Sequence, residues 1–128
     1  STALYLHFSD KSEMLLEICE DAFGALATRN AAILAEPARA EMRVRRMLEA
    51  YLDFALANPN AFQLVFQPEV GGVTAGERAA AAQALGRRCH DAFSQAVADL
   101  AEEAQLSQPT DAVAQALWAA VHGLAVLL

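Results

Sequence analysis

The sequence contains few residues that interrupt helices and few that favour strands. Among its 128 residues are only six glycines and four prolines, and no run of alternating β-branched residues occurs. Apolar residues make up 55% of the chain. A chain this apolar can bury a core, which argues against disorder. Its length suits one ordinary domain, and its composition predicts a compact helical one.

Basic residues are also scarce. Nine lysines and arginines stand against 16 acidic residues, which gives a formal net charge of −7. Broad nucleic-acid binding needs a basic face, so the net charge argues against such binding by this stretch as a whole. A short DNA-binding module at one end is not excluded by the same argument.

Cysteines and long apolar runs are limited too. Cys19 and Cys89 are far apart, and we expect no secretory signal, so the two cysteines are expected to be buried thiols in a reducing compartment. The most apolar stretch, residues 113–128, contains Gln115 and His122. We therefore expect it to form a buried helix and not a membrane span.

Apolar residues recur at helical spacing through most of the chain and predict an all-α antiparallel bundle. Asp10 and Glu13 form a capping box at the start of the first helix, which ends before Pro37. The expected helices cover residues 10–34, 39–57, 61–66 and 77–105, and a last one begins at Thr110 or Asp111.

The last helix is apolar on every side, and such a helix must be covered on every side. The chain has too few helices to cover both faces, so we expect a second copy to cover one, with Val121, Leu124 and Leu128 in the dimer interface. Gly123 inside this helix costs about 1 kcal/mol relative to alanine. A neighbouring backbone passing close by would explain it.

Four helices carry bulky or polarisable residues three or four positions apart, which places them on one side of each helix. Facing rings leave space for a ligand, and Tyr51 and His122 supply polar groups. The alternative is a solid core in which these two residues bond backbone or water. The expected pocket residues are Met47, Tyr51, Phe54, Phe62, Phe66, Cys89, Phe93, Trp118 and His122.

The sequence contains no group of residues that is spaced for catalysis or for metal binding. His90 and Asp91 are adjacent, whereas a helical metal-binding pair needs a spacing of three or four. The sequence places no nucleophile at the spacing from a base that catalysis needs. It also contains no suitably spaced pair of carboxylates and no phosphate-binding loop. We expect no enzyme activity, no metal and no cofactor.

The opening segment STALYLHFSDKSEML places Tyr5, His7 and Lys11 near one side of a short helix and the turn after it. A lysine at a helix start is mildly disfavoured by the helix dipole, unless a phosphate lies nearby. The pattern is typical of the end of a helix-turn-helix. The alternative is an ordinary solvated helix edge.

This segment resembles the signature of the TetR-type bacterial transcriptional regulators. The matching features are the motif Leu-Tyr-x-His-Phe at residues 4–8, the spacing to Lys11, and the apolar residues 14–15. A second resemblance lies in residues 117–125, where Trp118-x-x-x-His122-Gly123 is similar to the motif of the Trp-His-Gly subgroup of TetR C-terminal domains.

The resemblance implies three regions. Residues 1–9 would end a helix-turn-helix DNA-binding domain, residues 10–34 would form a connecting helix, and residues 38–128 would form the ligand-binding and dimerisation domain. It also implies that the first helices of the DNA-binding domain precede Ser1 and that a final helix follows Leu128.

The resemblance further implies a cytoplasmic, ligand-responsive repressor. It would bind double-stranded operator DNA as a homodimer and be released by a small apolar or aromatic effector, with no membrane partner. Thr2, Tyr5, His7 and Lys11 would contact DNA, mostly its backbone. Leu6 departs from the family pattern and offers DNA no hydrogen bond. The alternative function is a helical binding or dimerisation module without DNA binding.

Overall fold

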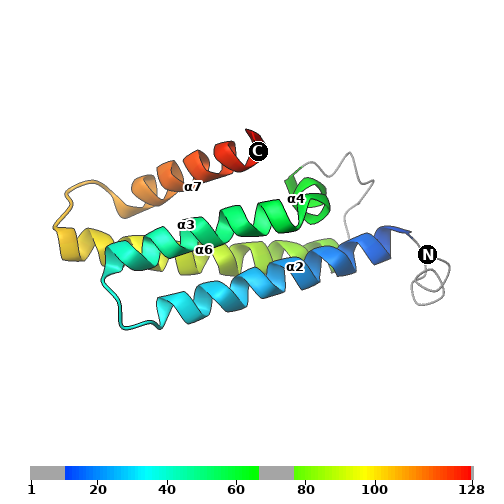
Figure 1. Cartoon of the computed structure of the whole chain (residues 1–128), viewed down its shortest axis with the longest axis horizontal. Coiled ribbons are helices and arrows are strands. Elements are labelled where there is room, and N and C mark those ends of the chain that lie inside the picture. The colour runs from blue at the N-terminus through cyan, green and yellow to red at the C-terminus, as the bar shows by residue number, and fades with distance from the viewer. Residues whose placement is uncertain (1–10, 67–76, 128) are drawn as a thin grey trace.

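The computed structural model describes residues 11–66 and 77–127, and the regular structure in those ranges is entirely helical. The helices are α2 (Lys11–Leu34), α3 (Ala40–Ala57), α4 (Pro59–Phe66), α6 (Glu77–Ala104) and α7 (Thr110–Leu127) (Figure 1). The expected all-α fold is confirmed, and the expected helix ends agree to within two residues. Asp10, the expected cap of the first helix, lies outside the described residues.

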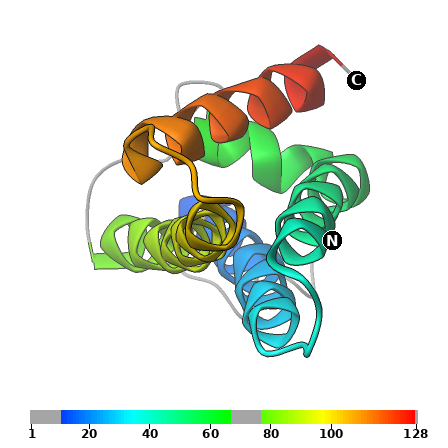
Figure 2. The same cartoon turned by 90° about the vertical axis from the view of Figure 1, so that its left-hand side faces the viewer.

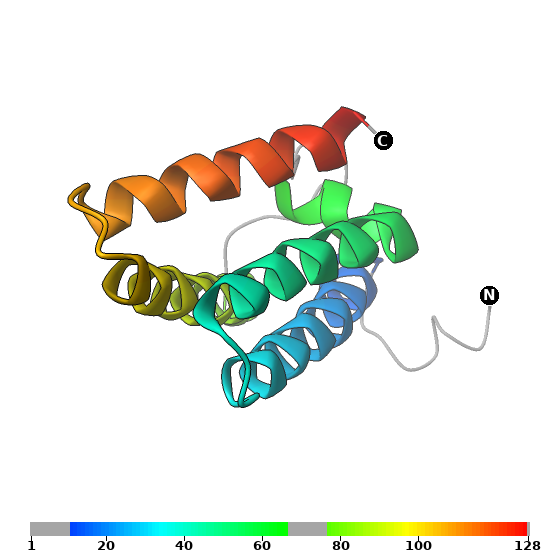
Figure 3. The same cartoon turned by 60° about the vertical axis from the view of Figure 1, so that its left-hand side comes forward.

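The helices form an up-and-down bundle. α2 and α6 run in one direction, and α3 and α7 run in the other (Figure 1). Viewed along the bundle, α7 lies over the side formed by α3 and α6, opposite α2 (Figure 2). The short α4 lies at the end of the bundle where α7 finishes (Figure 3).

The core is built from one apolar stripe on each long helix. α2 contributes Phe23 and Leu26, α3 contributes Met47 and Phe54, and α6 contributes Phe93, each at most 6% exposed. Burial of these side chains removes apolar surface from water, which is the dominant favourable term in folding. Ala40 and Ala96 are completely buried and let the helices approach closely.

The start of α3 is capped by another helix. Its N-cap residue, Arg39, makes no side-chain cap bond, but the backbone N–H of Ala40 donates to Glu103 Oε2 of α6 at 3.1 Å. Nearby, Arg43 donates to the carbonyl oxygens of Glu36 and Ala38. The first bond joins the start of α3 to the C-terminal end of α6, and the Arg43 bonds fasten the turn between α2 and α3 to α3.

α6 ends in a Schellman motif. Gln105 adopts a positive φ of 55°. The Leu106 N–H donates to the Ala101 carbonyl at 2.9 Å, and the Gln105 N–H donates to the Glu102 carbonyl at 3.3 Å. Glycine is the usual residue at this left-handed position, because any Cβ is strained there.

α7 has one packed side and one open side. Ala114, Val121 and Ala125 are buried, whereas Leu124, Val126 and other apolar residues are exposed. By length and composition alone, α7 is apolar enough to cross a membrane. The core helices of soluble proteins have the same property, so this observation is weak evidence for a membrane span.

Candidate ligand site

Five rings from four helices meet between α3 and α7. Tyr51 lies 4.8 Å from Trp118 and 6.2 Å from Phe62, measured between ring centroids. The His122 ring lies 5.4 Å from Phe62, and Phe93 lies 6.0 Å from Trp118. These separations and tilted orientations are those of aromatic pairs in contact. We call these five residues the ring cluster.

A hydrogen bond crosses the ring cluster. Tyr51 Oη lies 2.9 Å from His122 Nδ1, joining α3 to α7. Burial raises the pKa of the Tyr51 phenol well above its ordinary value, so the hydroxyl stays protonated in the physiological range. A neutral phenol can donate to an unprotonated imidazole nitrogen, so the two polar groups of the cluster satisfy each other.

Of the other expected pocket residues, Phe54 and Cys89 contact α2. Met47 is 2% exposed, and Phe54 packs on Phe23 of α2 with ring centroids 4.6 Å apart. The Cys89 thiol donates to the Phe23 carbonyl at 3.8 Å, and burial raises its pKa to about 11 despite the opposing charge of Arg88. Both cysteines are free and buried. The side chain of Phe66 lies outside the described residues.

The expected residues therefore surround one region, but the described side chains pack ring against ring. Sequence reasoning missed His90, whose ring lies 5.6 Å from Trp118 and whose Nε2 lies 3.4 Å from Ser94 Oγ. The position of His90 three residues before Phe93 was the available signal, since that spacing places both on one side of α6.

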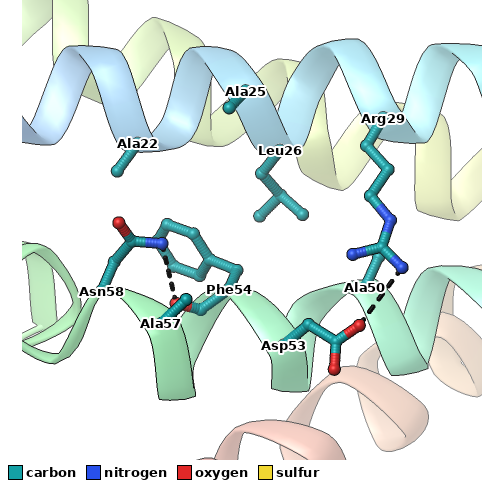
Figure 4. Close-up of a pocket in the computed structure, with 9 residues that line it drawn as sticks. All are labelled: Ala22, Ala25, Leu26, Arg29, Ala50, Asp53, Phe54, Ala57 and Asn58. Atoms are coloured by element: carbon teal, nitrogen blue, oxygen red, sulfur yellow. Dashed lines mark hydrogen bonds and ion pairs between the residues drawn. The ribbon is translucent and has the colours of Figure 1, made fainter.

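A pocket of about 200 Å³ lies elsewhere, between α2 and α3 (Figure 4). Sequence reasoning missed it too. The signal was a set of alanines at helical spacing on both helices, which leaves space where two helices face each other. The pocket is lined by Ala22, Ala25, Leu26, Arg29, Ala50, Asp53, Phe54, Ala57 and Asn58.

The expected DNA-contacting residues are mostly outside the described part of the chain. Thr2, Tyr5 and His7 fall there, together with residues 1–9 as a whole. Lys11 is the first residue of α2, but its side chain is not described. The DNA contacts therefore stay a prediction.

Of the three residues expected in the dimer interface, the two that the structure describes differ in exposure. Val121 is 7% exposed and belongs to the core of its own chain, so it offers a partner little surface. Leu124 is 47% exposed, and Leu128 lies outside the described residues. A Cβ added at Gly123 would meet nothing within 4 Å in its own chain. The expectation of a close neighbouring backbone at Gly123 therefore does not hold within one chain.

Within residues 11–66 and 77–127, no group of three or more histidine, cysteine or acidic residues is arranged to hold a metal ion. The ring cluster holds one hydrogen-bonded polar pair among apolar rings. Such an arrangement suits recognition of an apolar molecule more than chemical transformation of one.

Comparison with known proteins agrees with this architecture. Residues 44–128 match the family model described as "Tetracyclin repressor-like, C-terminal domain". No curated protein and no solved structure matches the chain. The matched segment begins inside α3, ends with the chain, and includes the ring cluster. Because it covers more than half of the sequence, the chain belongs to the family of tetracycline repressor-like C-terminal domains.

Proposed function

We propose that the protein is a ligand-responsive transcriptional regulator of the cytoplasm, acting as a repressor that binds operator DNA as a homodimer. The single observation that supports this most is the match of residues 44–128 to the repressor-like C-terminal domain. Residues 1–9, with the Leu-Tyr-x-His-Phe motif, would end the DNA-binding domain. The Trp118, His122 and Gly123 motif would place the chain in the Trp-His-Gly subgroup.

The connecting helix α2 would transmit the signal. Its first residue, Lys11, adjoins the proposed DNA-binding segment, and its second half carries Phe23 and Leu26 into the effector core. A dimer must place its recognition helices about 34–36 Å apart to reach successive major grooves. A ligand that changes the tilt of α2 would change this separation, so ligand and operator compete through one conformational equilibrium.

The effector would bind at the ring cluster. A small apolar or aromatic molecule suits its apolar rings and its Tyr51–His122 pair. Since the rings are in contact, such a molecule enters only by displacing one of them. Trp118 and His122 are the two partly exposed rings of the cluster. Because His122 is hydrogen-bonded to Tyr51, Trp118 is the ring with more room to move.

The open face of α7 would form the dimer interface. Leu124, Val126 and Leu127 are 47%, 53% and 85% exposed, which is costly for residues of this kind in water. The open space at Gly123 would let a second helix approach closely. A two-fold symmetric pairing would cover the same face on both copies.

The test uses a longer chain that carries a complete helix-turn-helix. Small apolar compounds are screened by thermal shift, and the hits are assayed for release of the protein from operator DNA. Specific operator binding that a hit abolishes supports the proposal, and the 128-residue chain should show no such binding. Absence of operator binding by the longer chain would favour the alternative, a helical binding or dimerisation module without DNA binding.

A further inference from the structure

We propose that the pocket between α2 and α3 is a second binding site, separate from the ring cluster. Its ligand would be a small flat acid with a hydroxyl group at the end opposite its carboxylate, about the size of a hydroxybenzoate. The inference depends on the geometry of α2 and α3 and not on the proposed role in transcription.

The pocket has the volume for one ring. Its floor is formed by Leu26 and Phe54, which are 4% and 6% exposed. Its sides are alanines of both helices: Ala22, Ala25, Ala50 and Ala57. A cavity of about 150 Å³ with apolar walls holds a benzene ring. The pocket, at about 200 Å³, therefore accommodates a ring and a small substituent.

One end of the pocket carries charge. Arg29 Nη2 of α2 lies 3.2 Å from Asp53 Oδ2 of α3, and both side chains are at least half exposed (Figure 4). A guanidinium group has five N–H donors in a fork that fits a carboxylate. The bond to Asp53 is made by one of its nitrogens, so Arg29 can accept a second carboxylate from a ligand. Asp53 would weaken the binding of that ligand by charge repulsion.

The opposite end carries an amide. Asn58 Nδ2 donates to the Phe54 carbonyl at 3.1 Å, which fixes the orientation of the side chain. In Figure 4 the amide oxygen of Asn58 points toward α2, at the far end of the pocket from Arg29. An amide oxygen accepts hydrogen bonds, so this end selects a ligand with a hydroxyl donor. The two ends together favour a hydroxy acid over a plain hydrocarbon.

The experiment titrates the 128-residue chain with 4-hydroxybenzoate, followed by ¹H–¹⁵N chemical shifts. A ligand of about ten heavy atoms is expected to bind with a Kd on the order of 1 mM. The amides of Ala22, Ala25 and Ala57 should shift together and saturate. 4-Hydroxybenzamide, which lacks the charge, should bind much more weakly, and benzoate, which lacks the hydroxyl, should bind less tightly than 4-hydroxybenzoate.

Single substitutions test the charged end and the apolar wall of the pocket separately. Arg29→Gln should weaken binding up to about fivefold, and Asp53→Asn should strengthen it up to about fivefold, since exposed charge pairs have modest effects. Ala25→Leu fills the pocket and should abolish binding. Ala31→Leu is the matched control, because both alanines are exposed on α2 but only Ala25 lines the pocket.

Several results would overturn the proposal. One is the absence of saturable shifts at ten times the expected Kd. Another is binding that Arg29→Gln and Ala25→Leu both leave unchanged, with the fold of each variant verified by circular dichroism. Shifts confined to Trp118 and His122 would place the ligand in the ring cluster. That result would support the proposed function and refute the second site. The experiment therefore distinguishes failure of the second site from failure of the proposed function.

Discussion

Replacing Phe93 by alanine tests whether the ring cluster is a solid core or the wall of a pocket. Phe93 is 2% exposed and is among the largest fully buried side chains of the described residues. An aromatic side chain buries at least about 150 Å². At about 25 cal/mol per Å², its full burial contributes about 4 kcal/mol. Alanine keeps part of this contribution, but the cavity left behind adds a further cost. The expected loss of unfolding free energy is about 3–5 kcal/mol.

The assay for Phe93→Ala is urea unfolding followed by circular dichroism, at fixed protein concentration because dimerisation would add to the apparent stability. With a urea m value of about 1–3 kcal/mol/M, the midpoint should fall by on the order of 2 M. Leu56→Ala is the control: Leu56 is 60% exposed, so its loss should change stability by no more than about 0.5 kcal/mol.

A small effect would refute the reasoning for Phe93. If Phe93→Ala lowers the unfolding free energy by less than about 1 kcal/mol with an unchanged m value, the site is not a packed core. A simultaneous change in the response to ligands would then identify a pocket wall. A loss of the expected size with an unchanged ligand response would count against an effector at the ring cluster.

Three further predictions concern other parts of the fold. Gln105→Gly should raise the unfolding free energy by about 0.5–1 kcal/mol, measured by urea unfolding, because glycine relieves the positive φ. Burial raises the pKa of Cys89 to about 11 from an ordinary value of 9.0, so its stabilising contribution is complete below pH 9 and is lost as the pH rises to 11. The decline in stability across that range should be smaller in Cys89→Ala, and an equal decline would contradict the assignment. Leu124→Glu should weaken a dimer seen by sedimentation velocity, while Ile18→Glu on α2, the helix opposite α7, should not.

Much of the fold was predictable because its signals are local. Pro37 and the segment around Pro59 end helices through backbone geometry that involves only neighbouring residues. Helical spacing then assigns each side chain to a face of its own helix. Tyr51 and His122 could thus be expected on facing sides of α3 and α7, although no local rule predicts the 2.9 Å hydrogen bond between them.

The orientation of α7 was not predictable from the sequence. Val121 was expected at a partner's surface but is buried in its own chain. A helix turns its apolar side toward the core only when its other side is polar, and α7 is apolar on all sides. Packing against α3 and α6 decides which residues turn inward.

The sequence by itself determined which segments are helical, where they end, and which residues on each helix are apolar, because spacing and backbone preferences act within a few residues. Only the tertiary structure decided that Glu103 of α6 caps α3 and that opposing alanines leave a pocket between α2 and α3. Both depend on the relative position of helices far apart in the chain. That position results from packing of all the side chains together, and no single segment encodes it.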